Sequence, residues 1–390
     1  MSKELIFTRY LYEKEEVEVA LILAILQKKE EEALFWAYEL YYSGFEYQLI
    51  NLLWKIYFDF YALLNSGFQS YLLKKLDSNI FKEDPKILGL VIQNFVIRPF
   101  NVDVFMLRHI QNQFEMPAPT SIAKKEVDLK SLFEEEETSE KESFDYEALL
   151  YFVFESDKPI ILEDIIQCKK IVKEWKKMEK ANLLININKK VLLLVYLLQY
   201  YGLKKNIKGG KNIYVYSDPS DFVMYETIEV DLSLKENKRI PKLPAYQILP
   251  IASIYSIQDD EFKFLSLFDF QREKGEKREA YLNHWLYYAS KSPLWKERIE
   301  LYHGHIMEDE KKITFENDDL EEEFYQNYGY EPDEQKKEIQ EKSIQELKNK
   351  NKNINNNIKS CKAFYQTFSK NRFIEIEEEY LEEVTTFFTY

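Results

Sequence analysis

The chain has 390 residues, with 53 Lys or Arg against 68 Asp or Glu and a formal net charge of −15. A hydrophobic fraction of 45% is typical of a globular protein and excludes wholesale disorder. Only 9 Gly and 11 Pro exclude a collagen-like chain, and 2 Cys exclude a disulfide framework or a four-thiolate zinc site. At roughly 100–200 residues per domain, the length predicts two or three folded units.

No apolar run approaches the roughly 20 residues that a membrane-spanning helix needs. The longest run, residues 191–198, ends at Gln199. The first residues are polar and acidic, unlike a signal or transit peptide. These features predict a soluble, intracellular chain with no membrane partner.

Residues 1–115 predict a helical bundle. Apolar residues recur at helical spacing over 15–27, and a second helix begins at the acidic residues 30–32, where the helix dipole favours negative charge. The second helix is expected to end at Ser43-Gly44, since Gly44 suits the left-handed conformation after a helix. A third helix is expected over 46–64, so a helical hairpin forms around Gly44.

The rest of the chain divides by composition. In order it predicts an acidic linker (116–143), a basic helical unit (144–216), an acidic α+β unit (217–333), an Asn/Lys-rich mobile segment (334–362) and a C-terminal docking segment (363–390). Residues 146–216 hold 13 Lys and 7 acidic residues, a net charge of +6, whereas residues 217–333 hold 14 basic and 26 acidic residues, a net of −12. The expected fold class is mainly α with a minor β component.

Several elements are expected within these units. Helices are predicted over 168–180, 190–201, 259–270, 276–289 and 293–303, and strands over 212–216, 224–232 and 311–315. Ser292 before Pro293 is a typical start for the last of these helices.

A row of lysines is the first candidate site. In the helix 168–180 one face is apolar and the opposite arc carries Lys169, Lys170, Lys173, Lys176, Lys177 and Lys180. A second group, Lys204, Lys205, Lys208 and Lys211, precedes the strand expected at 212–216, like the basic hairpin that forms the wing of a winged-helix domain. Such surfaces bind phosphates with strong salt dependence. The alternative is an ordinary solvated face over a core helix.

His303 and His305 form the second candidate. The His-x-His spacing can ligate zinc with Glu308 or Asp309 as an oxygen ligand. The simpler interpretation is that His303 lies at a helix end, where histidine favours the negative pole of the dipole.

No catalytic motif stands out. The turn 209–211 lacks the first Gly and the Ser or Thr of a phosphate-binding loop, and no Gly-x-Ser-x-Gly is present. We therefore expect no cofactor, and enzymatic activity is unsupported.

Aromatic residues make up 16% of the chain. Most are expected in the core, but Tyr and Trp are also enriched at protein interfaces. Tyr41, Tyr42, Trp285 and Trp295 are the candidate interface residues.

Three stretches carry a family resemblance: 36–44, 285–299 and 328–335. They resemble proteins of nucleocytoplasmic large DNA viruses whose activity is not established. The resemblance spans most of residues 1–335 and implies a host-cytoplasmic or virus-factory location, with the virion as a further possibility, and other viral proteins as partners. It carries over no catalytic residues.

The leading hypothesis is therefore a non-enzymatic interaction or assembly subunit of a large DNA virus. The alternative is a nucleic-acid-binding accessory factor in viral replication or transcription that uses the 169–180 face.

Overall fold

The computed structural model describes residues 5–114, 144–155, 173, 176, 189–211, 213–226, 277–328, 337 and 361–383. Helices dominate these residues, and the only sheet among them is a two-stranded antiparallel one. The fold is therefore mainly α with a minor β component, as predicted. The chain divides into two compact units: unit 1 (1–50, 78–96 and 215–356) and unit 2 (51–77, 97–214 and 357–390).

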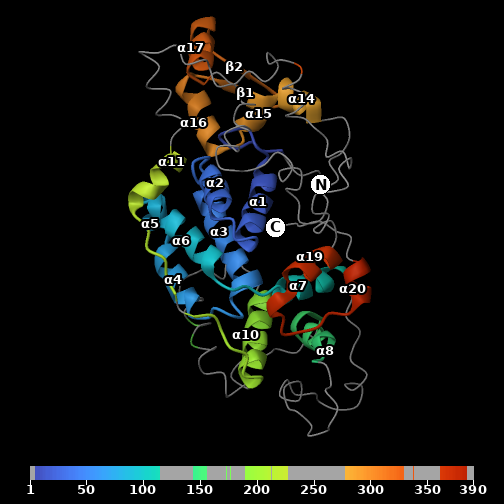
Figure 1. Cartoon of the computed structure of the whole chain (residues 1–390). Helices are drawn as coiled ribbons and strands as arrows, with labels where there is room; N and C mark the ends of the chain where they lie inside the picture. Colours follow the sequence, from blue (N-terminus) through green and yellow to red (C-terminus); the bar gives the residue numbers. More distant parts are fainter. Residues whose placement is uncertain are drawn as a thin grey trace. The chain divides into compact units, whose positions relative to one another are not determined.

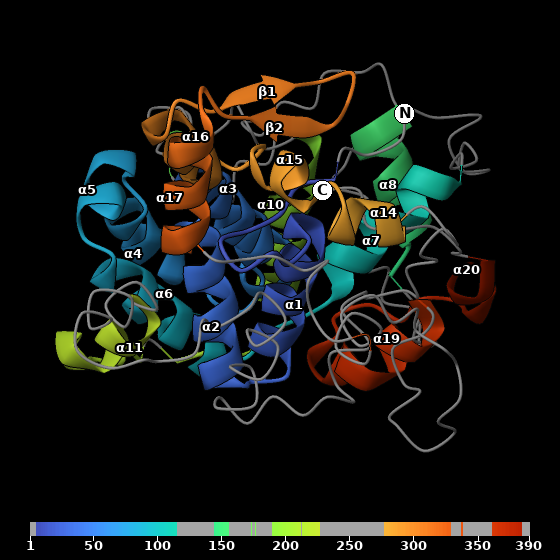
Figure 2. The ribbon, with the colours of Figure 1, turned by 90° about the horizontal axis from the view of Figure 1, so that it is seen from above.

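Unit 1 is built around a helical hairpin. Helices α1 (Lys14–Leu26) and α2 (Glu30–Tyr41) lie side by side, joined by a turn in which Lys28 has a φ of 63° (Figures 1 and 2). The Lys29 N–H donates to the Ala24 carbonyl at 2.9 Å and closes the turn, and the Lys28 ammonium donates to the Val96 carbonyl at 2.7 Å. The sequence predicted one apolar face for α1, but the helix is buried on nearly all sides, from Val19 to Leu26 without a break.

The end of α2 follows the prediction. Gly44 has a φ of +85°, and the Phe45 N–H donates to the Leu40 carbonyl at 3.1 Å, which closes the last turn. A Cβ on Gly44 would lie 2.6 Å from the Pro293 Cβ. Glycine is therefore required both for the backbone conformation and for the close approach of residue 293.

The remaining elements of unit 1 are short. They are the start of α3 (Glu46–Ile56), α5 (Ser78–Glu83), most of α6 (Lys86–Ile97), a 3₁₀ turn (Pro219–Phe222), α11 (Val223–Glu226), α14 (Lys277–Leu282), α15 (Trp285–Ala289), α16 (Pro293–Leu301), β1 (His305–Met307), β2 (Lys312–Thr314) and α17 (Asp318–Tyr328). In the sheet His305 pairs with Thr314 and Met307 with Lys312. We name residues 277–328 the hairpin lobe.

Unit 2 has its own helical core. It holds the rest of α3, a π-helical turn (Tyr57–Tyr61), α4 (Phe68–Lys75), α7 (Asp103–Gln113), α8 (Tyr146–Leu150), a second π-helical turn (Tyr151–Glu155), α10 (Lys189–Lys204), α19 (Cys361–Phe368), a 3₁₀ turn (Ser369–Asn371) and α20 (Glu378–Glu383). Phe364 of α19 packs on Phe105 of α7, with ring centroids 5.1 Å apart. We name residues 361–383 the C-terminal arm.

Several sequence predictions fail locally. The strand expected at 212–216 is not formed by its described residues 213–216, and the strand expected at 224–232 begins inside α11. The expected wing is therefore not formed by the described residues 213–216, which have no strand after the basic turn. The helix expected over 276–289 is broken at Asn283 and His284, and β1 was not foreseen. The linker 116–143 and the helix 259–270 lie outside the described residues.

Candidate interaction surfaces

A buried loop near the N-terminus organises unit 1. Residues 6–13 fold back on themselves: the Thr8 N–H donates to the Tyr12 carbonyl at 2.9 Å, and the Lys14 N–H donates to the Ile6 carbonyl at 2.9 Å. Leu11 makes the reversal with a φ of 61°. Every residue from Phe7 to Tyr12 is buried, including the charged Arg9.

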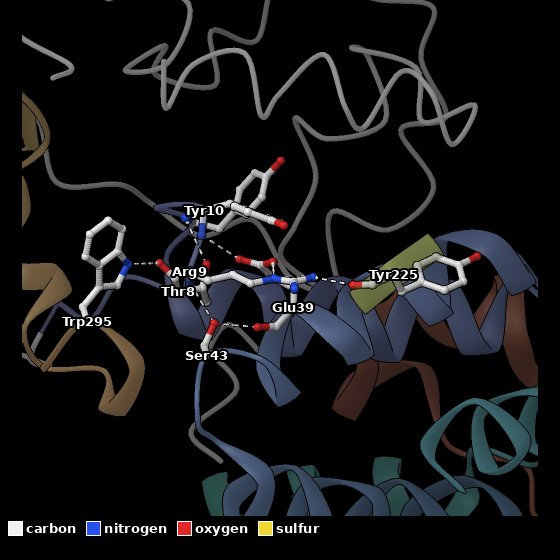
Figure 3. A network of polar contacts seen from close by, with 8 residues as sticks. Thr8, Arg9, Tyr10, Glu39, Ser43, Tyr225 and Trp295 are labelled. Carbon is white, nitrogen blue, oxygen red and sulfur yellow. Dashed lines mark hydrogen bonds and ion pairs between the residues drawn. The ribbon is translucent and has the colours of Figure 1, made fainter. Parts of the chain in front are cut away.

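Arg9 is paired with Glu39 of α2. The Arg9 Nε donates to Glu39 Oε2 at 2.8 Å, and the other carboxylate oxygen accepts the Tyr10 N–H at 3.0 Å (Figure 3). The guanidinium also donates from Nη2 to the Tyr225 carbonyl at 3.1 Å and lies 4.9 Å from the centroid of the Tyr42 ring. Both ions are thus compensated, as burial of a charge requires.

Ser43 and Trp295 complete this network. The Ser43 hydroxyl accepts the Arg9 N–H at 2.8 Å and donates to the Glu39 carbonyl at 2.6 Å. The Trp295 indole of α16 donates to the Thr8 carbonyl at 3.1 Å, so the N-terminal loop, α2 and the hairpin lobe meet in one place (Figure 3). These polar groups hydrogen-bond to one another, so we interpret the network as a structural contact that holds the three segments together rather than as a reactive site.

The hairpin lobe has a small aromatic core. Trp295, Tyr302, Phe315 and Tyr328 surround the fully buried Phe324, with centroid distances from 4.9 to 6.5 Å. Such ring pairs add packing energy beyond the area they bury.

Polar contacts fix the hairpin onto α15. Glu308 accepts from the Tyr287 hydroxyl at 2.5 Å and from the Lys291 ammonium at 2.7 Å. Both hydrogen bonds lower the pKa of Glu308, and the one from Lys291 has the larger effect. At the other end of the turn between β1 and β2, His284 Nδ1 lies 2.9 Å from the Lys311 carbonyl.

The surface of this lobe is acidic. From Lys296 to Glu323 the sequence holds 11 acidic residues against 4 basic ones. All of the carboxylates are exposed: Glu297, Glu300, Glu308, Asp309, Glu310, Glu316, Asp318, Asp319, Glu321, Glu322 and Glu323. Two apolar side chains are exposed among them, Leu301 at 67% and Met307 at 41%. We name this the acidic surface.

A second surface, on unit 2, is basic. Lys204, Lys205, Lys208 and Lys211 are all exposed, at the end of α10 and in the turn that follows it. The turn is anchored: the Ile207 N–H donates to the Gly202 carbonyl at 2.9 Å, and the Gly210 N–H donates to the Leu64 carbonyl at 2.6 Å. We name residues 204–211 the basic loop.

The glycines of the basic loop serve packing. A Cβ on Gly210 would lie 2.6 Å from Asn65 Oδ1 and 2.9 Å from Pro99 Cγ. Residue 210 must therefore be a glycine for its N–H to reach the Leu64 carbonyl. Close packing thus accounts for a glycine in the sequence 209–211, and no phosphate-binding loop is needed to explain it.

The lysine face predicted at 169–180 lies mostly outside the described residues. Lys173 and Lys176 are described as helical and exposed, in agreement with a solvated arc. Lys169, Lys170, Lys177 and Lys180 are not described.

The histidine pair does not gain a third ligand. His303 has a φ of 54° after the end of α16, and His305 lies in β1; both are exposed. Within the described ranges no three His, Cys, Asp or Glu side chains are placed to hold a metal ion.

The aromatic interface candidates are core residues. Tyr41, Trp285 and Trp295 are buried in unit 1, and Tyr42 is half-buried beside Arg9. The prediction that they form a surface is wrong for the three buried residues, because Tyr41 packs on Phe81 of α5 and the two tryptophans pack on each other within the hairpin lobe. Trp285 packs edge-on against Trp295 with centroids 5.6 Å apart.

Sequence reasoning missed the Arg9–Glu39 pair. The available signal was a single charge inside each of two apolar stretches, Phe7–Tyr12 and Leu34–Tyr41. A charge so placed is rarely buried without a partner.

Comparisons with known proteins give no match to a family model, a curated protein or a solved structure. Among the described residues, no helix is long and apolar enough to span a membrane.

Proposed function

We propose that this chain is a non-enzymatic interaction subunit that binds a basic protein partner through the acidic surface of the hairpin lobe. In keeping with the sequence resemblance, we place it in the assembly or the replication machinery of a large DNA virus, in the host cytoplasm or the virus factory. Other viral proteins are its expected partners.

One observation carries the proposal: the lobe combines many exposed carboxylates with a rigid support. Its aromatic core and the Glu308 contacts hold the lobe together, and the Trp295 indole ties it to the N-terminal loop. A surface that is already ordered loses little conformational entropy when it binds.

The chemistry of the surface indicates the kind of partner. Eleven exposed carboxylates favour a partner rich in Lys or Arg, since charge complementarity guides encounter and suppresses wrong partners. Leu301 and Met307 supply apolar area among the charges. Apolar contact of this kind, at the centre of a polar rim, is typical of interfaces.

Charge reversal tests the proposal. The variant Glu297→Lys/Glu316→Lys/Glu323→Lys changes three exposed carboxylates of the lobe. The matched control, Glu155→Lys/Glu377→Lys/Glu379→Lys, makes the same charge change on exposed residues of unit 2. Tagged full-length chains are cross-linked in infected cells, treated with nuclease, and the cross-linked lysines are mapped.

We expect nuclease-resistant cross-links from Lys296, Lys311 or Lys312 of the lobe to a basic partner. The lobe variant should lose most of this partner, and the control should keep it. Equal recovery of the partner by both variants would remove the acidic surface from the proposal. Absence of any specific cross-linked protein would remove the interaction function itself.

A further inference from the structure

The basic loop is unusual in so acidic a chain. From Lys189 to Ser217 there is no Asp or Glu, although the chain holds 68. The same stretch contains six lysines: Lys189, Lys190, Lys204, Lys205, Lys208 and Lys211. Among the described residues, no carboxylate forms an ion pair with Lys204, Lys208 or Lys211. The charges of these three ammonium groups are therefore not neutralised by an ion pair within the described part of the chain.

The loop also has a defined backbone. Asn206 takes a φ of 52°, which ends α10, and the anchors at Gly202 and Leu64 hold the residues on either side of Lys208. At the end of α10, the Lys204 ammonium lies 5.7 Å from the centroid of the Tyr200 ring, within the range of a cation–π contact. The lysines are thus presented from an ordered support rather than from a free tail.

The positive charge extends beyond the loop. Lys189 and Lys190 are exposed at the start of α10, and the loop lies at its other end. A helix of 16 residues is about 24 Å long at 1.5 Å per residue. Lys173 and Lys176 of the same unit are also exposed. Charges spread over such a length fit an extended polyanion better than a single small anion.

We infer that the basic loop and the exposed lysines of α10 form a binding site for the sugar–phosphate backbone of nucleic acid. Each lysine acts as a point charge on a phosphate and lacks the planar fork of arginine, so the binding is tolerant of sequence. It is also governed by release of counterions, and its affinity falls steeply with salt.

The alternative occupants of such a surface are an acidic protein or an anionic membrane. Leu203 at 64% exposure and Ile213 at 56% exposure flank the loop and would suit either of them. The length of the lysine array and the absence of carboxylates over 29 residues favour the regularly charged polymer. The experiment below includes the other two as separate arms.

The test is fluorescence anisotropy with the full chain and two nucleic-acid probes, a homopolymeric single strand and a duplex of the same length. Two further arms measure binding to an acidic polypeptide and to vesicles containing phosphatidylserine. If each of the six lysines of α10 and the basic loop neutralises one phosphate, duplex binding weakens roughly 2,000-fold between about 50 and about 200 mM salt, and single-strand binding roughly 300-fold. In the variant Lys204→Gln/Lys208→Gln/Lys211→Gln, the same increase in salt should weaken duplex binding only roughly 40-fold, because three of the six lysines remain.

The matched control is Lys82→Gln/Lys296→Gln/Lys312→Gln, which removes three exposed lysines of unit 1. We expect it to bind both probes as the unchanged chain does. Both variants should keep the far-ultraviolet circular dichroism of the unchanged chain, since the replaced side chains are exposed.

Three results would overturn the inference. They are no binding of either probe at about 50 mM salt, equal weakening by both variants, and binding only to an acidic polypeptide or to vesicles containing phosphatidylserine. Preference between the single strand and the duplex, once the loop variant has weakened both, identifies the form of nucleic acid.

Discussion

We expect docking of the C-terminal arm to depend on pH, and the substitution Asp103→Asn to abolish this dependence. Asp103 Oδ2 accepts the Phe373 N–H of the arm at 2.6 Å and the Asn101 side-chain amide at 2.8 Å. The same Asn101 amide donates to the Asn371 carbonyl at 2.7 Å. The carboxyl group is completely buried, so it forms the centre of the contact that holds residues 371–373 on unit 2.

Burial raises the pKa of Asp103 from 3.8 to about 6. The groups that face it oppose this rise: the Asn101 amide, the N–H groups of Phe373 and Ile374, and the charge of Arg372. The nearby Tyr365 has its own pKa raised, by burial first and then by the Asp103 charge among other contributions. Asp103 is thus more easily protonated in the docked state than in an opened one.

The sign follows from linkage. Asp103 binds its proton more tightly when the arm is docked than when it is open. The resulting stabilisation of the docked arm is fully present below a pH of about 4 and is lost as the pH rises through about 6. A shift of about two units corresponds to about 3 kcal/mol at 1.36 kcal/mol per unit. Asparagine keeps an acceptor for the Phe373 N–H and does not titrate, so the variant arm should hold equally well across this range.

Hydrogen exchange of peptides from residues 361–383 measures the opening of the arm directly. After correction for the intrinsic rate, protection of the unchanged chain should fall as the pH rises, and protection of Asp103→Asn should stay constant. Asp145→Asn is the control, because Asp145 caps α8 through the Ala148 N–H and asparagine caps equally well. An unchanged pH dependence in Asp103→Asn, or the opposite sign in the unchanged chain, would refute the reasoning.

Three further substitutions test the contacts that hold unit 1 together. The free energy of unfolding is measured by urea unfolding followed through tryptophan fluorescence. Arg9→Met leaves Glu39 buried without its ion and should cost about 3–5 kcal/mol, whereas the double variant with Glu39→Met should cost less than the sum of the two single changes. Gly44→Ala should cost about 2 kcal/mol, since alanine is strained at this φ and its Cβ would overlap Pro293. Ser292→Ala removes the cap of α16 and should cost about 1 kcal/mol, and Ser292→Gly only a few tenths. A double Arg9/Glu39 change as costly as the sum, or a neutral Gly44→Ala, would contradict these assignments.

The sequence predicts the longer helices because their signals are local. Glu30 to Glu32 mark the start of α2 and Gly44 marks its end, and both are where the structure has them. Ser292 and Pro293 likewise start α16. Each of these signals acts within one or two turns of the helix, so no tertiary information is needed.

The failures concern residues whose partners are distant in the sequence. Ile213 looks like part of a strand, but its carbonyl accepts from the Arg98 guanidinium at 2.6 Å instead of from a neighbouring strand. The three residues of β1 are too few to show an alternating pattern, and they form a strand because Lys312–Thr314 pairs with them. Arg9 and Glu39 lie 30 residues apart; each apolar neighbourhood indicates a charge that needs a partner, but neither indicates which residue that partner is.

The charge pattern is the global feature that the sequence does reveal. The sign reverses between residues 216 and 217, and the chain passes from unit 2 to unit 1 between residues 214 and 215. The basic loop and the acidic surface therefore belong to different units, each with its own supporting core. Carboxylates repel phosphates, so the proposed nucleic-acid ligand should depend on the lysines of unit 2 and the proposed basic protein on the carboxylates of the hairpin lobe. Charge reversal on one unit at a time should therefore abolish one of these two proposed interactions and leave the other.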